Sequence, residues 1–437
     1  MREPDLLVVG GGILGLSAAF LAAERGWRVE LWRLPDSPRP EADTLRNIAW
    51  LHTGLAYAEL FKDAAAPDLP SPLSLLLKEG GRRMMEAFGL SNENEPPGIF
   101  RVSPEKEDSF LRNARLLNAE FNLMTPERAR RNAGPFAGAD KCYEVWGEIR
   151  FPEPQVLSQC QERAGDTSGL LQIHEDRRPV ILEVDEGNER GYRISVPVGD
   201  NRREQIRPAN TFLATGIRLP EMLSALNVTH ELRVFGTPLL CVRGDPWIYP
   251  NGLFHHYMGA KGLTILSHQT PSPERTCNVV GARICSEVPD VNARFGEGAD
   301  IDETLGGLPE LLRTEMHTNP GAYTVTAAYK VGRIEQTVTG VRPKKPCPME
   351  EIWEKGPPEL PDGLYAAFPG RATLAYLTAQ KVLHRIFGDR AGPGTEAHPF
   401  DPAADGAMDN PSARTTGKFR MHWEYEDLDE RRPVINV

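Results

Sequence analysis

Residues 6–32 read LLVVGGGILGLSAAFLAAERGWRVELW. The first four are apolar and run directly into glycine, which is typical of a buried parallel strand. Residues 14–25 are rich in Ala and Leu and predict a helix that ends at Gly26. Residues 29–32 predict a second strand. A strand, a glycine turn, a helix and a strand within about 30 residues make a βαβ unit.

Gly10, Gly12 and Gly15 give this unit the spacing G-x-G-x-x-G, which spans Ile13 and Leu14. The first glycine allows a tight turn, the second lets the backbone approach a pyrophosphate, and the third lets helix and strand pack closely. The helix N-terminus then offers N–H groups and a positive dipole to the phosphates. Because the motif lies between a strand and a helix, it predicts a dinucleotide site. The alternative is a structural glycine turn.

The second strand of such a unit usually ends at an acid that holds the ribose, about 20 residues after the first glycine. Glu30 is 20 residues after Gly10, but it lies within the strand, where Val29 and Leu31 are expected to point inward. The position at the end of the strand is Arg33. An arginine there can bind the 2′-phosphate of NADP, stack on adenine, contact the pyrophosphate or be solvated. The βαβ unit alone therefore leaves the identity of the dinucleotide open.

The size and composition of the chain indicate a soluble protein of several domains. Its 437 residues suggest two or three domains at about 150 residues each. A net charge of −11 argues against broad nucleic-acid binding. No apolar run reaches the ~18 residues that a transmembrane helix needs. No basic region followed by an apolar segment opens the chain, so we expect no signal peptide and a cytoplasmic location.

The cysteines form no CxxC pair and no zinc-ligand spacing. We therefore expect no metal site, and buried or idle thiols in a reducing compartment. They are Cys142, Cys160, Cys241, Cys277, Cys285 and Cys347.

Further elements follow from hydrophobic periodicity. Short strand-like runs between 234 and 284 predict a mostly antiparallel sheet and hence a second domain. After residue 389 the composition predicts an extended tail, whose acidic stretch 424–430 can dock to a basic partner or simply be solvated. Helices are expected at 73–88, 106–121, 126–132 and 374–386, and strands at 183–198, 211–214, 239–242, 263–266, 277–280 and 363–367.

Four further segments carry a family resemblance. Residues 44–54 read TLRNIAWLHTG, 212–216 read FLATG, 339–343 read TGVRP and 366–374 read AAFPGRATL. Together with the opening motif they resemble the D-amino-acid-oxidase-like FAD-dependent oxidoreductases. The first segment is most similar to the L-2-hydroxyglutarate dehydrogenase branch, in which R-N-x-x-x-x-H-x-G follows the second strand. The order and spacing match over roughly residues 5–388.

The resemblance implies a Rossmann-like α/β FAD-binding domain of the GR2 type, with an inserted α+β substrate domain on a mostly antiparallel sheet. The expected parts are 1–80, 145–225 and 335–390 for the FAD-binding domain, 81–144 and 226–334 for the substrate domain, and 391–437 for the tail.

The resemblance also implies which residues hold FAD, with a helix N-terminus near 370–373 directed at the flavin pyrimidine. Two positions depart from the family: the ribose acid is absent, and Leu45 replaces a hydroxyl residue that would bind phosphate. The expected cofactor-binding residues are Gly10, Gly12, Ile13, Leu14, Gly15, Arg33, Arg46, Asn47, Val184, Ala214, Thr215, Gly216, Gly370, Arg371, Ala372 and Thr373.

Two residues are candidates for the chemistry. By the resemblance Arg342 clamps a substrate carboxylate, because its planar fork pairs with carboxylate in two hydrogen bonds; the alternative is a structural arginine before Pro343. His52 is the candidate base, since its ordinary pKa lies near neutrality. His255 and Tyr257 fall in the expected substrate domain, where a surface loop is the alternative.

The function expected from these residues is oxidation of a small carboxylate-bearing substrate, a 2-hydroxy acid or an amino acid, by hydride transfer to FAD. The electron acceptor that reoxidises the flavin is dioxygen, a quinone or a protein. Two alternatives stay open: an NADP-linked reductase, because of Arg33, and a flavin-fold subunit that scaffolds a partner protein, because of Leu45 and the acidic tail.

Overall fold

The structure is a computed structural model of the chain. It describes residues 3–32, 50–51, 53–59, 68–90, 97–133, 140–150, 162, 169–174, 181–184, 192–197, 203–226, 228, 232–243, 254–258, 263–268, 277–282, 286–288, 310, 313, 322–337, 340–343, 351–353, 360–368, 372–388 and 435–436.

A six-stranded sheet with the order β20-β21-β12-β1-β2-β8 forms the first layer. All its neighbours are parallel except β20 and β21. The four residues of β1 are all buried, as expected for a parallel strand covered on both faces. The strands are β1 (Leu6–Val9), β2 (Val29–Trp32), β8 (Leu171–His174), β12 (Asn210–Leu213), β20 (Glu351–Trp353) and β21 (Leu364–Phe368).

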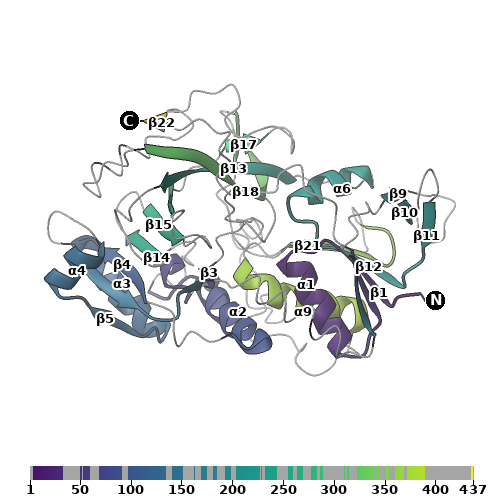
Figure 1. The fold of residues 1–437 in the computed structure, drawn as a ribbon, viewed down its shortest axis with the longest axis horizontal. Coiled ribbons are helices and arrows are strands. Elements are labelled where there is room, and N and C mark those ends of the chain that lie inside the picture. The colour runs from purple at the N-terminus through teal and green to yellow at the C-terminus, as the bar shows by residue number, and fades with distance from the viewer. Residues whose placement is uncertain are drawn as a thin grey trace.

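Helices cover one face of this sheet. Helix α1 (Ile13–Glu24) is buried along its length and packs beside α9 (Ala375–Phe387), as Figure 1 shows. A helix that is apolar all round belongs in a protein interior. The predicted βαβ unit is confirmed, with both strands at their expected bounds.

The other face of the sheet is covered by a three-stranded meander and a short helix. Leu7 and Val9 of β1 pack there with Tyr192 and Ile194 of the meander. The elements are β9 (Ile181–Val184), β10 (Tyr192–Pro197), β11 (Arg203–Ile206), η4 (Gly216–Arg218) and α6 (Leu219–Ala225).

An 11-stranded sheet with the order β19-β18-β13-β16-β15-β14-β4-β6-β5 on its main path forms a second layer, and β17 and β22 pair with β13 and β18. Its pairs are antiparallel except β14 with β4. The strands are β4 (Gly98–Val102), β5 (Phe121–Leu123), β6 (Lys141–Val145), β13 (Leu232–Arg243), β14 (Phe254–Met258), β15 (Leu263–His268), β16 (Cys277–Ala282), β17 (Ser286–Val288), β18 (Ala322–Thr337), β19 (Gly340–Pro343) and β22 (Ile435–Asn436).

The β14–β4 pair joins two distant stretches of chain. Helices α3 (Pro104–Leu116) and α4 (Pro126–Ala133) lie at this end of the molecule, opposite the meander (Figure 1). Strand β18 continues past residue 334 and β19 pairs with it, so this hairpin belongs to the large sheet by hydrogen bonding. The division of the chain into domains stays a prediction.

The main differences from the expected elements are a shorter helix, a divided strand and a long strand that was not predicted. The helix expected at 106–121 ends at Leu116, because Asn118 takes a positive φ of 46° that stops the helix, and Phe121 starts β5. The strand expected at 183–198 is two strands, β9 and β10. The sixteen-residue β18 was not predicted.

Cys142 is a free, buried thiol, and burial raises its pKa to about 12. The expectation of a buried thiol is confirmed for this residue. None of the described helices is long and apolar enough to cross a membrane. The acidic stretch 424–430 lies outside the described residues.

Candidate functional site

The turn between β1 and α1 leads into a helix N-terminus whose N-cap residue has no capping side chain. Gly10 donates its N–H to the carbonyl of Trp32 at 2.8 Å, which ties the turn to the end of β2. Gly12 is the N-cap residue of α1 and provides no side-chain cap, and the first turn of the helix contains no acid. The first N–H groups of a helix have no partner within it, so this end is suited to a phosphate.

Backbone contacts make glycine necessary on both sides of this turn. Gly10 has a φ of +116°, and a Cβ there would lie 2.3 Å from the carbonyl oxygen of Ala214. A Cβ on Gly15 would lie 1.9 Å from the carbonyl oxygen of Gly10. Ala214 in turn donates its N–H to the carbonyl of Val9 at 2.8 Å. The expected Gly10–Gly15 and 214–216 segments therefore meet.

A buried hydroxyl at this junction has no protein partner among the described residues. Thr215 is 8% exposed, and its Oγ1 is buried without a hydrogen bond to any of them. Buried polar atoms are normally hydrogen-bonded, so a hydroxyl without a described partner close to the N-terminus of α1 indicates a polar ligand. The residues of this junction fit the diphosphate of a dinucleotide.

The Glu30 carboxylate contacts the side chains of Trp32 and His174. It pairs in register with Leu7, and its carboxylate accepts a hydrogen bond from Trp32 Nε1 at 3.0 Å. The His174 ring stacks on Trp32 at 4.1 Å, with its Nε2 at 3.5 Å from Glu30. The interpretation that Glu30 does not occupy the ribose position agrees with these contacts. The described part of β2 ends at Trp32, and Arg33 lies outside the described residues.

The segment that carried the resemblance is held on two sides. Strand β3 (Trp50–Leu51) pairs with β7 (Ile149–Arg150), and Thr53 hydrogen-bonds to Glu148 through its amide at 3.1 Å and its hydroxyl at 2.5 Å. His52 itself lies outside the described residues, but both of its neighbours are placed.

Gly54 packs against helix α2 (Pro72–Phe88). Its φ is +89°, and a Cβ would lie 2.1 Å from the carbonyl oxygen of Ser74. Ser74 Oγ donates to the carbonyl of Gly54 at 2.7 Å. Gly54 then begins the short helix η3 (Leu55–Tyr57) as its N-cap. The start of α2 therefore fixes the turn that follows His52.

The same helix packs against η6 (Ala372–Leu374), the turn before α9. Leu73 and Leu77 form an apolar cluster with Leu374 and Leu377. A Cβ on Gly80 would lie 2.4 Å from the carbonyl oxygen of Thr373. Because β3 also contacts η6, the structure brings Trp50 and Leu51 together with the 372–374 turn.

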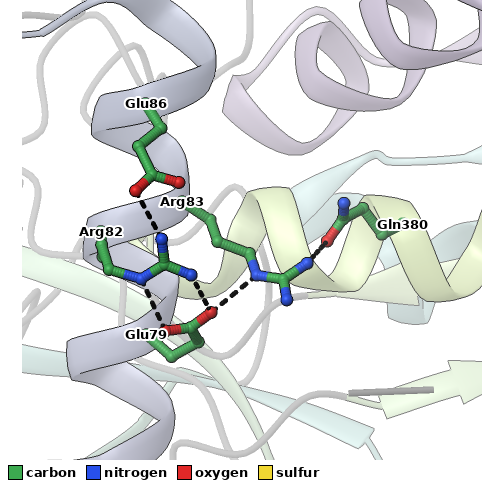
Figure 2. A network of polar contacts seen from close by, with 5 residues as sticks. All are labelled: Glu79, Arg82, Arg83, Glu86 and Gln380. Carbon is green, nitrogen blue, oxygen red and sulfur yellow. Dashed lines mark hydrogen bonds and ion pairs between the residues drawn. The ribbon is translucent and has the colours of Figure 1, made fainter. Parts of the chain in front are cut away.

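A polar network links α2 to α9 on the surface beside this junction. Figure 2 shows Arg83 between Glu79 of its own helix and Gln380 of α9, at 2.7 Å and 3.3 Å. Arg82 instead pairs with Glu79 and Glu86, both on α2. Only Arg83 of these two arginines bridges the helices in this network.

The remaining expected residues are placed as follows. Arg342 lies in β19 opposite Glu335 of β18. His255 and Tyr257 lie in β14, in register with Ile99 and Arg101 of β4. Val184 ends β9 in the meander sheet, apart from the six-stranded sheet. Six expected residues lie outside the described part of the chain: Arg33, Arg46, Asn47, His52, Gly370 and Arg371.

Sequence reasoning missed the residues that support the junction, namely Glu148, Ser74 and Arg83. Thr53 and Glu148 are 95 positions apart, so no local spacing connects them. Only the Ser-Pro start of α2, a helix-start signal, marks the region of Ser74.

Known proteins agree with this architecture. The family model described as FAD dependent oxidoreductase (DAO) matches residues 5–369. The methylenetetrahydrofolate–tRNA-(uracil-5-)-methyltransferase TrmFO of Rubrobacter xylanophilus is 43% identical over 131 residues, which are 30% of this chain and 27% of that protein. The chain thus spans about a quarter of the length of this curated relative.

Two solved structures are similar over nearly the whole chain. Iminodiacetate oxidase from Chelativorans sp. BNC1 has a TM-score of 0.57 and 16% identity, covering 88% of this chain and 95% of that one. Glycine oxidase from Geobacillus kaustophilus has a TM-score of 0.54 and 14% identity, covering 92% and 98%. At this identity the likeness concerns the fold. The family model matches residues 5–369, which is most of the chain. The chain therefore belongs to the DAO family of FAD-dependent oxidoreductases, and its cofactor is FAD.

Proposed function

We propose that the chain oxidises the C–N bond of a small amino acid with FAD. The observation that carries this proposal is the junction of Thr53 and Gly54 with α2 and η6, because the family resemblance puts the flavin ring there. The similar structures named above are oxidases of glycine and iminodiacetate, both amines that carry carboxylate.

FAD supplies the two-electron acceptor. Bound FAD would accept a hydride from the substrate carbon and a base of the chain would take the proton on nitrogen, which would convert the C–N single bond to C=N. We assign the diphosphate of FAD to the Gly10–Gly15 and 214–216 turns, and the flavin to the region of 370–373. His52 is the proposed base, next to the fixed Thr53.

Arg342 is the proposed carboxylate clamp. It lies on the β18–β19 hairpin, and β18 contacts η4, which begins at Gly216 of the dinucleotide turn. The same large sheet carries β14 with His255 and Tyr257, which we propose to line the substrate site. A guanidinium is suited to a carboxylate because it forms two parallel hydrogen bonds.

A 2-hydroxy acid is the second candidate substrate. The R-N-x-x-x-x-H-x-G segment at 46–54 favours it, since this pattern is similar to the L-2-hydroxyglutarate dehydrogenase branch. An NADP-linked reductase and a non-catalytic scaffold are not favoured, because the match to the FAD-dependent oxidoreductase family includes the segments 44–54, 212–216 and 339–343 that carried the resemblance.

Anaerobic titration of the purified protein tests the proposal. We expect glycine, N-methylglycine, iminodiacetate or L-proline to bleach the flavin band, and admission of air or of a quinone then identifies the acceptor. Bleaching by 2-hydroxy acids alone would select the second candidate. A flavin that dithionite reduces but neither substrate class bleaches would contradict both.

Arg342→Lys and Arg342→Ala test the clamp. Lysine keeps the charge but loses the fork, so we expect kcat/KM for a carboxylate substrate to fall about 10-fold or more in both variants, and further in the alanine variant. Loss of FAD from Arg342→Ala with unchanged substrate affinity would instead indicate a structural arginine.

A further inference from the structure

Glu148 is a buried carboxylate whose hydrogen bonds include two from Thr53, a residue of the site. It lies between β6 and β7 and is 1% exposed. One of its oxygens accepts both the amide N–H of Thr53 and the Thr53 hydroxyl. A charge is removed from water at great cost unless it is hydrogen-bonded, so this pair of contacts is a strong local constraint.

The constraint acts on the backbone between β3 and η3. The turn that carries Glu148 closes around Thr53, since a Cβ on Gly147 would lie 3.1 Å from Thr53 Cγ2. Thr53 Oγ1 also accepts the N–H of Leu55 at 3.3 Å. With Leu51 paired to Ile149 and Gly54 held by Ser74, the backbone is fixed at three neighbouring points.

We propose that Glu148 is a positioning residue for the flavin site. By holding Thr53, it keeps Gly54 against α2 and β3 in contact with η6. This inference rests on the proposed function, because it takes the flavin ring to lie at that junction. Glu148 acts through Thr53 and is not itself a catalytic residue.

The oxygen matters in this role more than the negative charge. A glutamine at 148 retains an acceptor oxygen of similar reach, whereas an alanine leaves the Thr53 N–H and hydroxyl without it. Thr53→Ser retains both donors and Thr53→Val removes only the hydroxyl. The four variants therefore separate the effects of the acceptor oxygen at position 148, of its negative charge and of the Thr53 hydroxyl.

Glu144 provides the matched control. It is also a buried carboxylate of the same chain region, and it pairs with Arg128 at 2.6 Å, away from Thr53. Glu144→Ala should lower the melting temperature as Glu148→Ala does, because each removes one partner of a buried polar contact.

The readouts are the dissociation constant of FAD, the visible circular dichroism of bound flavin, and kcat and KM with whichever amine bleaches the wild type. For Glu148→Ala we expect weaker FAD binding, an altered dichroism spectrum and a kcat lowered about 100-fold with KM changed less, as for a misplaced reacting group. Glu148→Gln and Thr53→Ser should stay within a few-fold of wild type, and Glu144→Ala should keep the wild-type spectrum.

Two results would overturn the inference. In the first, Glu148→Ala keeps the wild-type flavin spectrum and kcat but has a melting temperature lowered as in Glu144→Ala. This would show that Glu148 has only a structural role. Glu148→Gln could be as impaired as Glu148→Ala, which would make the charge decisive. If no amine is oxidised by the wild type, the proposed function fails, but FAD affinity and flavin dichroism still decide the role of Glu148.

Discussion

At the scale of single residues, the close approach of Gly10 to Ala214 matters most. The glycine has a left-handed φ and no room for a side chain, so two structural demands coincide at one position. Its neighbour Thr215 contributes the buried hydroxyl without a described partner. The glycine motif could be read from the sequence because its spacing is local. The support that Glu148 gives Thr53 could not, because the two residues meet only in the folded chain.

Gly10→Ala should abolish FAD binding. The new Cβ must push β12 away from β1, since it would meet the Ala214 carbonyl at 2.3 Å. Gly26→Ala is the control, because Gly26 also has a positive φ but no atom within 4 Å of the added Cβ. We expect it to cost about 1–2 kcal/mol and to retain flavin. Flavin content after gel filtration gives the result; equal content in both variants would refute the role of this contact.

Glu30 should stabilise the protein in a pH-dependent way. The close approach of His174 Nε2, at 3.5 Å, is the main cause that lowers the pKa of Glu30; the hydrogen bond from Trp32 contributes further, while burial opposes the shift. A lowered pKa stabilises the fold above the ordinary glutamate pKa of about 4.3, and this stabilisation is lost as the pH falls through the folded-state pKa.

Glu30→Gln should therefore be about 1 kcal/mol less stable than wild type at pH 7, and the difference should shrink in acid. Urea unfolding at a series of pH values measures it. A difference that stays constant down to acid pH would mean that the carboxylate charge contributes nothing.

At the scale of elements, the strands and helices with strong local patterns were predictable. β1, β2 and α2 were predicted within one residue because burial imposes a pattern on each segment alone. β18 was missed because its pairing with β13 joins segments about 90 positions apart, and the sequence of either strand does not reveal the other. The contact of α2 with η6 also depends on the fold, although α2 and a helix start near 370–373 were expected from the sequence.

The bridge from α2 to α9 gives a test at this scale. Arg83→Met removes the link to Gln380 and should destabilise the protein by about 0.5–1.5 kcal/mol and weaken FAD binding, because η6 lies between the two helices. Arg82→Met removes contacts within α2 at a more exposed site and should cost about 0–0.5 kcal/mol.

Thermal unfolding and FAD titration of both variants decide the question. If Arg82→Met weakens FAD binding as much as Arg83→Met does, the bridge between the helices has no special role at the site.

At the scale of the whole molecule, two sheets carry different parts of the proposed site. The six-stranded sheet carries the glycine turn, and the 11-stranded sheet carries Arg342, His255 and Tyr257. The large sheet is assembled from distant parts of the chain through β4 and β14, which explains why its antiparallel character was easier to predict than its extent. The contact of β18 with η4 connects the two sheets near the dinucleotide turn.

The central claim is that this chain holds FAD at the turn between β1 and α1. The most direct measurement is the cofactor content of the purified full chain, from its visible spectrum and by titration of stripped protein with FAD and, separately, with NADP. We predict the absorption bands of oxidised flavin, saturable uptake of one FAD per chain, and no competition by NADP. A colourless protein that takes up NADP but not FAD would contradict the account.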